Sequence, residues 1–561
     1  MSPAQKATPR RASAMIGERA VAAYARPTLA LILAFVSGLT SLGYQVLWTR
    51  LLSSGTGNST YVFTLILGIF LIGIALGAMA FSTVRMRIRR PIGLIALAQV
   101  GVASLAVLGL ILAIARPVAI DPNQPLESAI GVFVPILIVV LPTTFVMGFT
   151  FPATAALLSD NPRRVAANAG LLLAVNTTGA IVATFAIPFF VIPAVGSPTA
   201  VALLALINAT TGIALATKLG PFHRLATGGL AVAVAMSIVV ASLRPGLIID
   251  PSIVRIQRLE ARLFDSREDE IASVQAGSTS TPELWVTGTS MTLLTVDAKL
   301  MPIMPLMVRP ASKSALTVAF GMGTAYRAAL IAGLGTDAIE LVPSVPKMFQ
   351  YFYDDAAAVL ADPNGRVIVT DGRNHVELTD RTYDIIVTDP PPPIESSGAS
   401  VISSLEYYQA GKDRLNPGGV MMQWTPYGGT VDEFKAHLRT FHSVFPYMIV
   451  AFGSGGYGFY FMGSDAPMAL DQASIRDVLS RPGVLEDISS AYDSPETTVD
   501  GWERRIQEMV WIQDDEVSSF TGDGPLITDD RPLPEYFLLR RLFGTPSPRL
   551  TPGELLRIMP R

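Results

Sequence analysis

A glycine turn and a carboxylate downstream of it form a pattern typical of nucleoside binding. Gly321 and Gly323 follow the apolar run Ala315–Phe320, which we predict to be a buried strand. Glu340 lies 17 residues beyond Gly323, within the next β-rich run. A carboxylate there can accept hydrogen bonds from both hydroxyls of a ribose. Because a glycine pair after a strand is often only a tight turn, the prediction depends on this spacing.

Two more acidic residues follow the third and fourth β-rich runs. Asp371, followed by Gly372, ends the run Arg366–Thr370, and Asp389 ends the run Tyr383–Thr388. Asp371 could accept a hydrogen bond from an exocyclic amine such as that of adenine, and Asp389 is expected to face the same crevice. One such acid alone is more often a helix cap or a surface residue. No Lys or Arg residues accompany these three acids to bind phosphate groups. The acids therefore suit a nucleoside or a sulfonium better than a pyrophosphate.

The elements that must position these residues alternate between strands and helices. The helix Tyr326–Gly333 separates the first strand from Ala338–Leu341, and a fifth strand is predicted at Gly419–Trp424. This order predicts a parallel sheet whose ligand lies beyond the carboxyl ends of its strands. The runs Glu283–Gly288 and Met291–Val296 are expected to pair as a hairpin ahead of the sheet.

The first half of the chain has a different composition. Mean hydropathy is +0.44 and only 16% of residues are charged, which is too apolar for a fully soluble chain of 561 residues. Seven apolar stretches are long enough to cross a bilayer as helices, at 28–48, 61–82, 92–115, 130–158, 166–192, 198–217 and 225–243. Gly73 and Gly77 in the second stretch have the GxxxG spacing that allows close helix packing.

Basic residues in alternate loops predict the orientation of these spans. If the N-terminus is cytoplasmic, thirteen Lys and Arg lie on the inside, while the opposite loops hold only Arg50 and Arg116. The inside residues are Lys6, Arg10, Arg11, Arg19, Arg26, Arg85, Arg87, Arg89, Arg90, Arg163, Arg164, Lys218 and Arg224. An odd number of spans then places everything after Arg244 outside the cytoplasm. We therefore expect a multi-pass protein of the cell membrane with an extracytoplasmic C-terminal domain.

Charge and cysteine content exclude several partners. Residues 1–250 have a net charge of +11 and the remainder −14, so the acidic C-terminal half would repel nucleic acid. The chain has no cysteine, which rules out disulfides, thiolate nucleophiles and cysteine-bound metals. The four histidines have no repeated metal spacing, and we predict no metal site. The expected partners are the lipid bilayer and a nucleoside-type small molecule.

The ordered motifs of the second half resemble the spermidine synthase (polyamine aminopropyltransferase) family. They are Gly-x-Gly, Glu340, Asp371-Gly372, Tyr383–Asp389, Ser404–Tyr408 and Leu415–Val420. The runs Tyr44–Leu51 and Thr528–Pro532 are more narrowly similar to bacterial proteins in which a multi-pass membrane region is fused to such a domain. The resemblance implies a Rossmann-like sheet preceded by a small β-domain, and often a dimer.

The resemblance also implies roles for individual residues. Glu340 and Asp371 match positions that hold the ribose and adenine of decarboxylated S-adenosylmethionine, and Asp389 matches the catalytic acid. Gln275 loosely matches a glutamine of the β-domain that contacts the donor. We accordingly divide the chain into a basic cytoplasmic tail at 1–26, a membrane domain at 27–244, a small β subdomain at 265–310, a spermidine-synthase-like Rossmann domain at 311–545 and a tail at 546–561.

The chain departs from the family where the amines would bind. Met322 stands at the position of an aspartate that binds the aminopropyl ammonium, and Pro392 at that of a second carboxylate. Ala298 and Lys299 replace a His-Glu pair. Aminopropyl transfer needs carboxylates to hold cationic amines and to accept a proton. The nucleoside half of the site is thus retained, and the amine half is depleted.

Three functions remain open on the sequence. The first is a membrane-anchored transferase with an adenosine-containing donor, aminopropyl transfer being the default of the family. The second is S-adenosylmethionine-dependent methylation of an envelope acceptor, and the third is an inactive domain that binds a nucleoside or a partner. The candidate ligands are decarboxylated S-adenosylmethionine, S-adenosylmethionine and methylthioadenosine, with no tightly bound cofactor.

Overall fold

The computed structural model describes most of the chain, and its residues fall into two compact units. The described ranges are 26–57, 59–84, 91–118, 120–121, 124–158, 165–243, 248–390, 395–396, 398–544, 547–551, 554–555 and 557. One unit comprises Met1–Leu52, Val62–Val118 and Val132–Pro251; the other comprises Ser53–Tyr61, Ala119–Gly131 and Ser252–Arg561. Most of the two predicted tails, and most of the basic residues that predict the orientation, lie outside the described ranges.

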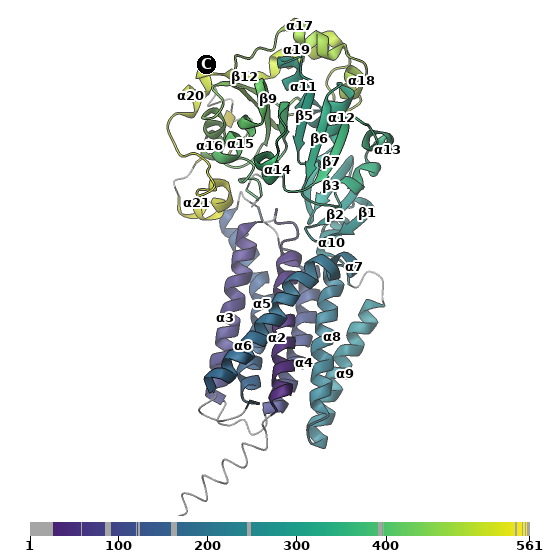
Figure 1. Cartoon of the computed structure of the whole chain (residues 1–561), viewed down its shortest axis with the longest axis vertical. Helices are drawn as coiled ribbons and strands as arrows, with labels where there is room; N and C mark the ends of the chain where they lie inside the picture. Colours follow the sequence, from purple (N-terminus) through teal and green to yellow (C-terminus); the bar gives the residue numbers. More distant parts are fainter. Residues whose placement is uncertain are drawn as a thin grey trace, which may run out of the picture. The chain divides into compact units, whose positions relative to one another are not determined.

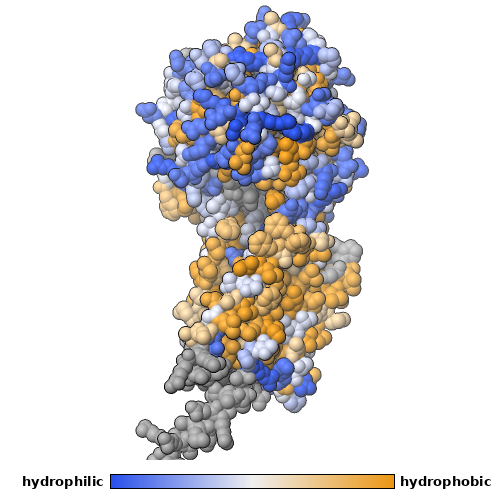
Figure 2. Space-filling view, in the orientation of Figure 1, coloured by the Kyte–Doolittle hydropathy of each residue, from blue (hydrophilic) through white to orange (hydrophobic). Residues whose placement is uncertain are grey.

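The first unit is helical. Within the described residues, seven helices are long and apolar enough to cross a membrane, one for each predicted span. They are α2 (Pro27–Leu52), α3 (Thr60–Val84), α4 (Pro91–Ala115), α5 (Pro125–Ala155), α6 (Val165–Ala186) continued by the π-helix η3 (Ile187–Val191) and α7 (Ile192–Val195), α8 (Ser197–Ala216) and α9 (Pro221–Ser242) (Figure 1). Their surface is mainly hydrophobic, whereas that of the α/β region is mainly hydrophilic (Figure 2).

Small and polar residues join these helices at close range. A Cβ atom at Gly73 would lie 1.9 Å from Thr144 Oγ1, and one at Gly77 would lie 2.0 Å from the carbonyl oxygen of Phe145. Helices α3 and α5 can therefore touch only because both positions are glycine, as the GxxxG spacing predicts. Between other helices, Asn208 donates to Gln99 Oε1 at 2.5 Å and accepts from the Tyr44 hydroxyl at 3.0 Å.

The second unit contains a small antiparallel sheet of four strands in the order β1-β2-β3-β4. The strands are β1 (Arg262–Glu268), β2 (Ser273–Ser278), β3 (Pro282–Val286) and β4 (Thr289–Leu293). The predicted hairpin is β3 with β4, but β4 ends at Leu293 because Val296 begins helix α11 (Val296–Val308). This helix packs on the large sheet, although it falls within the range predicted for the β subdomain.

The large sheet has eight strands in the order β12-β10-β11-β9-β8-β5-β6-β7. They are β5 (Ser314–Val318), β6 (Gly335–Glu340), β7 (Gly365–Val369), β8 (Tyr383–Thr388), β9 (Leu415–Pro426), β10 (Tyr447–Phe452), β11 (Gly458–Ser464) and β12 (Val510–Gln513). Strands β5 to β9 are parallel, and β10, β11 and β12 add antiparallel pairs. The chain runs outward from β5 through β6 to β7 and then returns to β8 on the other side of β5. This reversal is the topological switch point at which open α/β sheets bind ligands.

Helices cover both faces of the large sheet (Figure 1). One face packs against α11, α12 (Thr324–Ile331), α17 (Gln472–Leu479), α18 (Val484–Ser489) and α19 (Val499–Met509). The other packs against α14 (Gly372–Leu378), α15 (Leu405–Asp413), α16 (Val431–His442) and α20 (Asp515–Thr521). The short elements η4 (Pro346–Tyr351), α13 (Ala356–Leu360), η5 (Leu533–Tyr536), α21 (Phe537–Phe543) and α10 (Pro251–Arg258) complete the chain. The predicted fold class, helical spans followed by a Rossmann-like domain, is confirmed.

Candidate active site at the switch point

The glycine turn after β5 adopts a backbone that few residues other than glycine tolerate. Gly321 has φ of +54° and Gly323 has φ of +74°. A Cβ at Gly323 would also lie 2.6 Å from ring carbons of Phe349, whereas one at Gly321 would meet only Thr292 Cγ2 at 3.6 Å. Gly323 is thus required by contact as well as by conformation, and Gly321 borders the more open side of the turn.

Glu340 stabilises this turn through hydrogen bonds to backbone amides. Its Oε2 accepts from the amides of Phe320 at 3.1 Å and Gly321 at 3.4 Å, and its Oε1 accepts from the amide of Val342 at 2.8 Å. Burial raises the pKa of the Glu340 carboxyl, and these amide hydrogen bonds partly oppose the rise. Since a carboxylate offers about four acceptor positions, three backbone bonds leave little capacity for ribose hydroxyls. Glu340 therefore holds the turn in place, and its contact with a ribose stays a prediction.

Asp371 is the N-cap of helix α14. Its Oδ1 accepts from the amide of Asn374 at 2.8 Å, a typical stabilising contact at a helix start. A Cβ at Gly372 would lie 2.6 Å from Val318 Cγ1, so this glycine lets α14 approach β5 closely. Strand order brings Asp371 to the same edge of the sheet as Glu340, because β7 lies beside β6.

Asp389 follows β8 directly and differs from the other two acids. Its amide donates to the Val318 carbonyl at 3.1 Å, which ties it to the end of β5. Residue alternation turns its side chain to the face of Ile385 and Val387, which pack in one core with Trp424. Burial alone raises the pKa of the Asp389 carboxyl to about 7. A carboxyl group in that range can exchange protons at physiological pH.

Gln275 lies in β2 of the small sheet. Its neighbours Val274 and Ala276 pack with Phe320 and Met322 in one cluster, so alternation places Gln275 on the opposite face of the sheet. There its Nε2 donates to Ser273 Oγ at 2.6 Å. The structure does not bring Gln275 to the glycine turn, and its contact with a donor stays a prediction.

The positions that depart from the family have structural roles of their own. Met322 is buried in the apolar cluster beneath the small sheet. Lys299 is also buried, and its Nζ donates to Asp487 Oδ1 at 3.0 Å and Ser490 Oγ at 2.9 Å. Ala298 packs into the core of the large sheet, and Pro392 lies outside the described residues. Neither Met322 nor Lys299 supplies a carboxylate for an amine.

Sequence reasoning missed an acidic group on the same face as Asp389. Asp297, in the first turn of α11, is 1% exposed and accepts from the Tyr460 hydroxyl at 3.0 Å. Asp493 accepts from the amide of Val296 at 2.8 Å. The charges of Asp297, Asp493 and Asp389 all add to the burial that raises the pKa of Tyr460. No motif marks Asp297 or Asp493, because one precedes an apolar run and the other lies in a coil.

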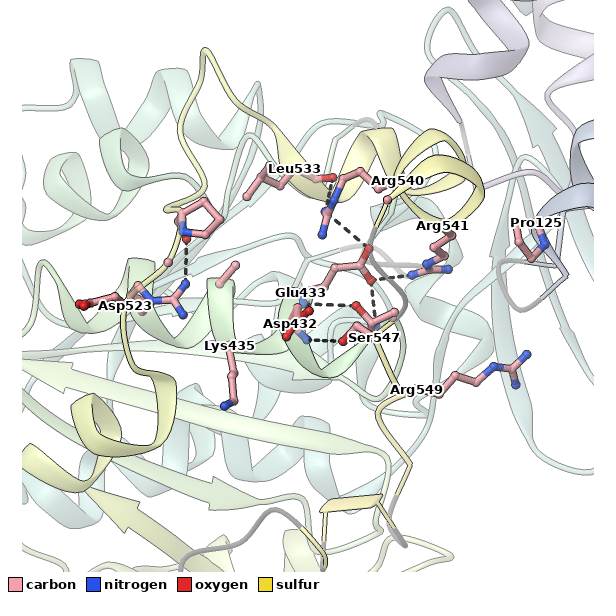
Figure 3. A pocket seen from close by; sticks show the side chains of 17 residues that line it. Pro125, Asp432, Glu433, Lys435, Asp523, Leu533, Arg540, Arg541, Ser547 and Arg549 are labelled. Atoms are coloured by element: carbon pink, nitrogen blue, oxygen red, sulfur yellow. Dashed lines mark hydrogen bonds and ion pairs between the residues drawn. The ribbon is translucent and has the colours of Figure 1, made fainter.

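A separate cavity of about 540 Å³ has a basic lining (Figure 3). Arg540 and Arg541 point toward Glu433, with the Arg541 Nη2 atom 2.6 Å from Oε2. Arg439 donates to the carbonyls of Thr521, Gly522 and Pro525 at 2.8–2.9 Å. These guanidinium groups are bound to internal acceptors, and the cavity contains none of the acids at the switch point. Within the described residues, no group of three or more His, Cys, Asp or Glu is arranged to hold a metal ion.

Part of the α/β domain matches a known family. Residues 330–452, which include Glu340, Asp371 and Asp389, match the spermine/spermidine synthase domain. The polyamine aminopropyltransferase of Aeropyrum pernix is 32% identical over 84 residues, which is 15% of this chain and 24% of that protein. The enzyme of the same name from Saccharolobus solfataricus is 25% identical over 163 residues, 28% of this chain and 51% of that protein. The chain thus matches between a quarter and a half of the length of these relatives.

Solved structures of spermidine synthases are also similar to this chain. One, in complex with the transition-state analogue AdoDATO, has a TM-score of 0.36 and 18% identity, covering 44% of this chain and 89% of its own. The enzyme of Thermotoga maritima has a TM-score of 0.35 and 18% identity, covering 44% and 88%. The family match of the α/β domain covers residues 330–452.

Proposed function

We propose that the spermidine-synthase-like domain transfers an aminopropyl group from a donor of the decarboxylated S-adenosylmethionine type to an amine. The observation that supports this most strongly is Asp389, whose carboxyl group has a pKa of about 7 and lies at the switch point of the sheet. A base of that pKa is about half deprotonated at neutral pH, where amines are mostly protonated. It suits the removal of a proton from an attacking nitrogen.

Asp389 is the one base that this reaction needs, and atoms and charge balance in each step. The acceptor ammonium loses a proton to Asp389, and the freed nitrogen attacks the methylene carbon bound to the sulfonium. A C–N bond forms as the C–S bond breaks, and the electron pair of that bond returns to sulfur. Neutral methylthioadenosine leaves, and Asp389 releases its proton to solvent.

The nucleoside part of the donor would lie along the ends of β5, β6 and β7. Gly321 and Gly323 let the backbone approach the ligand, and Glu340 keeps the turn in shape through its bonds to Phe320 and Gly321. Asp371 has one oxygen on the α14 cap, which leaves its second oxygen to accept from adenine.

The test uses the full-length chain in detergent or nanodiscs. Binding of methylthioadenosine, decarboxylated S-adenosylmethionine and S-adenosylmethionine is measured by calorimetry, and turnover is followed as methylthioadenosine release. We expect the first two to bind and the second to react with an added amine. If S-adenosylmethionine alone reacts, the domain is a methyltransferase. If no nucleoside binds, the proposal is wrong and a structural or partner-binding role takes its place.

We further propose that the seven apolar helices anchor the enzyme in the cell membrane with its α/β domain outside the cytoplasm. The charge distribution of the loops supports this orientation. The segments Ser53–Tyr61 and Ala119–Gly131, which connect α2 to α3 and α4 to α5, belong to the same compact unit as the α/β domain. These are the connections on the side poor in Lys and Arg.

A further inference from the structure

The motif Thr528–Pro532, which the proposed reaction does not use, forms a tight turn. The amide of its fourth residue, Arg531, donates to the carbonyl of its first residue at 3.0 Å, which leaves Asp529 at a central position of the turn. Just before the turn, the carbonyl of Ile527 accepts from the amide of Leu405 at 2.9 Å, and Leu405 begins helix α15. The turn is therefore fixed beside the start of α15.

Asp529 and Arg373 form a bidentate ion pair. The Nη1 atom of Arg373 lies 2.5 Å from Asp529 Oδ1, and its Nη2 atom lies 2.6 Å from Oδ2. Two parallel hydrogen bonds of this kind fix the orientation of both planar groups as well as attracting them. They also lower the pKa of the Asp529 carboxyl, so this residue is ionised at neutral pH.

The pair is accessible to solvent, because the Asp529 side chain is 42% exposed. Exposed ion pairs contribute little to the free energy of unfolding, since water competes for both charges and two long side chains lose freedom. The pair therefore contributes more to the local geometry than to the stability of the fold.

Arg373 carries this constraint to the nucleoside half of the site. It stands in the first turn of α14, two residues after Asp371, which caps that helix. Its Nε atom lies 2.7 Å from Glu377 Oε1, one turn further along α14. Its Nη1 atom reaches Ser404 Oγ, on the N-cap of α15, at 3.4 Å. Arg373 thus joins the first turn of α14 to the start of α15 and to Asp529.

Core packing holds the first turn of α14 less firmly than the rest of the helix. The helix is only seven residues long, and Val376 is its one buried residue. Val376 lies more than a turn beyond Asp371, and Gly372, which approaches β5, has no side chain to fix it there. The position of the second Asp371 oxygen, which we propose to accept from adenine, therefore depends on the link through Arg373.

We propose that Asp529 is a positioning residue of the nucleoside site, which acts through Arg373 on the helix turn that Asp371 caps. This inference rests on the proposed function, because it uses Asp371 as the adenine acceptor. It gives the motif Thr528–Pro532 a role in donor binding, and no step of the transfer at Asp389 involves it.

The test uses the full-length protein in nanodiscs and compares Asp529→Ala, Arg373→Gln and the double variant. Methylthioadenosine binding is measured by calorimetry. We expect each single variant to bind on the order of tenfold more weakly, and the double variant to bind no more weakly than either, because the two residues act as one unit. Asp529→Glu keeps a carboxylate and should retain most of the affinity. Asp529→Asn serves if Asp529→Ala does not fold.

Three measurements separate positioning from a general loss of structure. In Asp529→Ala, KM for decarboxylated S-adenosylmethionine should rise on the order of tenfold while kcat stays within about twofold, since the base Asp389 is unchanged. The melting temperature should fall by at most about 2–4 °C, as for a partly exposed ion pair. Deuterium exchange should rise at the amides of the first turn of α14 and stay the same in β5.

Asp530→Ala is the matched control, because Asp530 is the exposed neighbour of Asp529 in the same turn. It should bind methylthioadenosine like the unaltered protein. Unchanged affinity in Asp529→Ala, or additive losses in the double variant, would overturn the inference and leave the proposed function standing. If the unaltered protein binds no nucleoside, the proposed function fails and this inference fails with it.

Discussion

Three carboxylates at neighbouring strand ends have different surroundings, and this sets what each can do. Glu340 is bound to backbone amides, and Asp371 caps a helix. Burial raises the pKa of Asp389 without any opposing hydrogen bond or ion pair. The acid whose charge is least stabilised in the fold is the one suited to accept a proton.

Replacing Asp389 by Asn should lower turnover by about a hundredfold to ten-thousandfold, the usual range for a lost general base. Nucleoside affinity should stay nearly the same, because no donor-holding group is changed. In the unaltered protein, kcat should fall as the pH drops below about 7, where Asp389 becomes protonated. A pH–rate profile of both proteins checks this, and full activity of Asp389→Asn would leave Asp389 no role beyond packing.

The same shift predicts a stability effect. In the folded protein the pKa of the Asp389 carboxyl is about 7, above its ordinary value of 3.8. The folded state is therefore more stable at low pH, where this carboxyl is neutral, and it loses that stability as the pH rises toward 7. Because Asn does not ionise, the Asp389→Asn protein keeps this stability at high pH. Above pH 7 it should melt at a higher temperature than the unaltered protein. Thermal melts at several pH values measure the difference, which should vanish near pH 4.

Glu340→Gln and Asp371→Asn form a contrasting pair. Gln places an amide group where Glu340 accepts three backbone N–H bonds, so this variant should lose about 1–3 kcal/mol in nucleoside binding and also some stability. Asn is as good an N-cap as Asp, so Asp371→Asn should fold normally and lose only nucleoside affinity. Calorimetry and denaturant unfolding separate the two effects; unchanged affinity in both variants would contradict the nucleoside site.

The glycine turn after β5 is the element whose geometry matters most. Gly323→Ala should destabilise the domain more than Gly321→Ala, since both have positive φ but only the former would strike Phe349. The conformational cost alone is about 1–2 kcal/mol for each. Denaturant unfolding of the two variants measures which one loses more free energy of unfolding. Equal losses would show that Phe349 moves aside at little cost.

The elements themselves were largely predictable, whereas the acids Asp297 and Asp493 were not. Strand β8 was predicted with its observed bounds at Tyr383–Thr388, because a buried apolar run ends there at a charged residue. Strands β1 and β2 were missed, since Arg262–Glu268 is mostly polar and carries no clear alternation. Asp493 accepts from the amide of Val296, the neighbour of Asp297, and a contact across 197 residues leaves no local signal.

At the scale of the whole molecule, the orientation of the chain can be tested with single cysteines. The chain has none, so Ala473→Cys in the exposed first turn of α17 would be a unique label. We expect a membrane-impermeant maleimide to modify it on intact cells, because the proposed orientation, with seven spans and a cytoplasmic N-terminus, would place the α/β domain outside.

Two further single cysteines calibrate this measurement. Ala115→Cys lies near Arg116 on the predicted outer side, and Thr217→Cys lies at the end of the predicted span 198–217, next to Lys218 on the predicted inner side. The first should react before lysis and the second only after it. Reaction of Ala473→Cys only after lysis would place the domain in the cytoplasm and show the orientation to be wrong.

The α/β unit is not continuous along the chain, and this affects how it is made. The amide of Gly55 donates to the Thr287 carbonyl at 2.7 Å, and that of Gly57 to Thr289 Oγ1 across 232 residues. Residues 53–61 are synthesised long before the strands that they join, and the apolar helices α3 to α9 are synthesised between them. Completion of the α/β unit therefore awaits synthesis of all these helices, and a shortened chain that begins at Ser252 would lack part of its own domain.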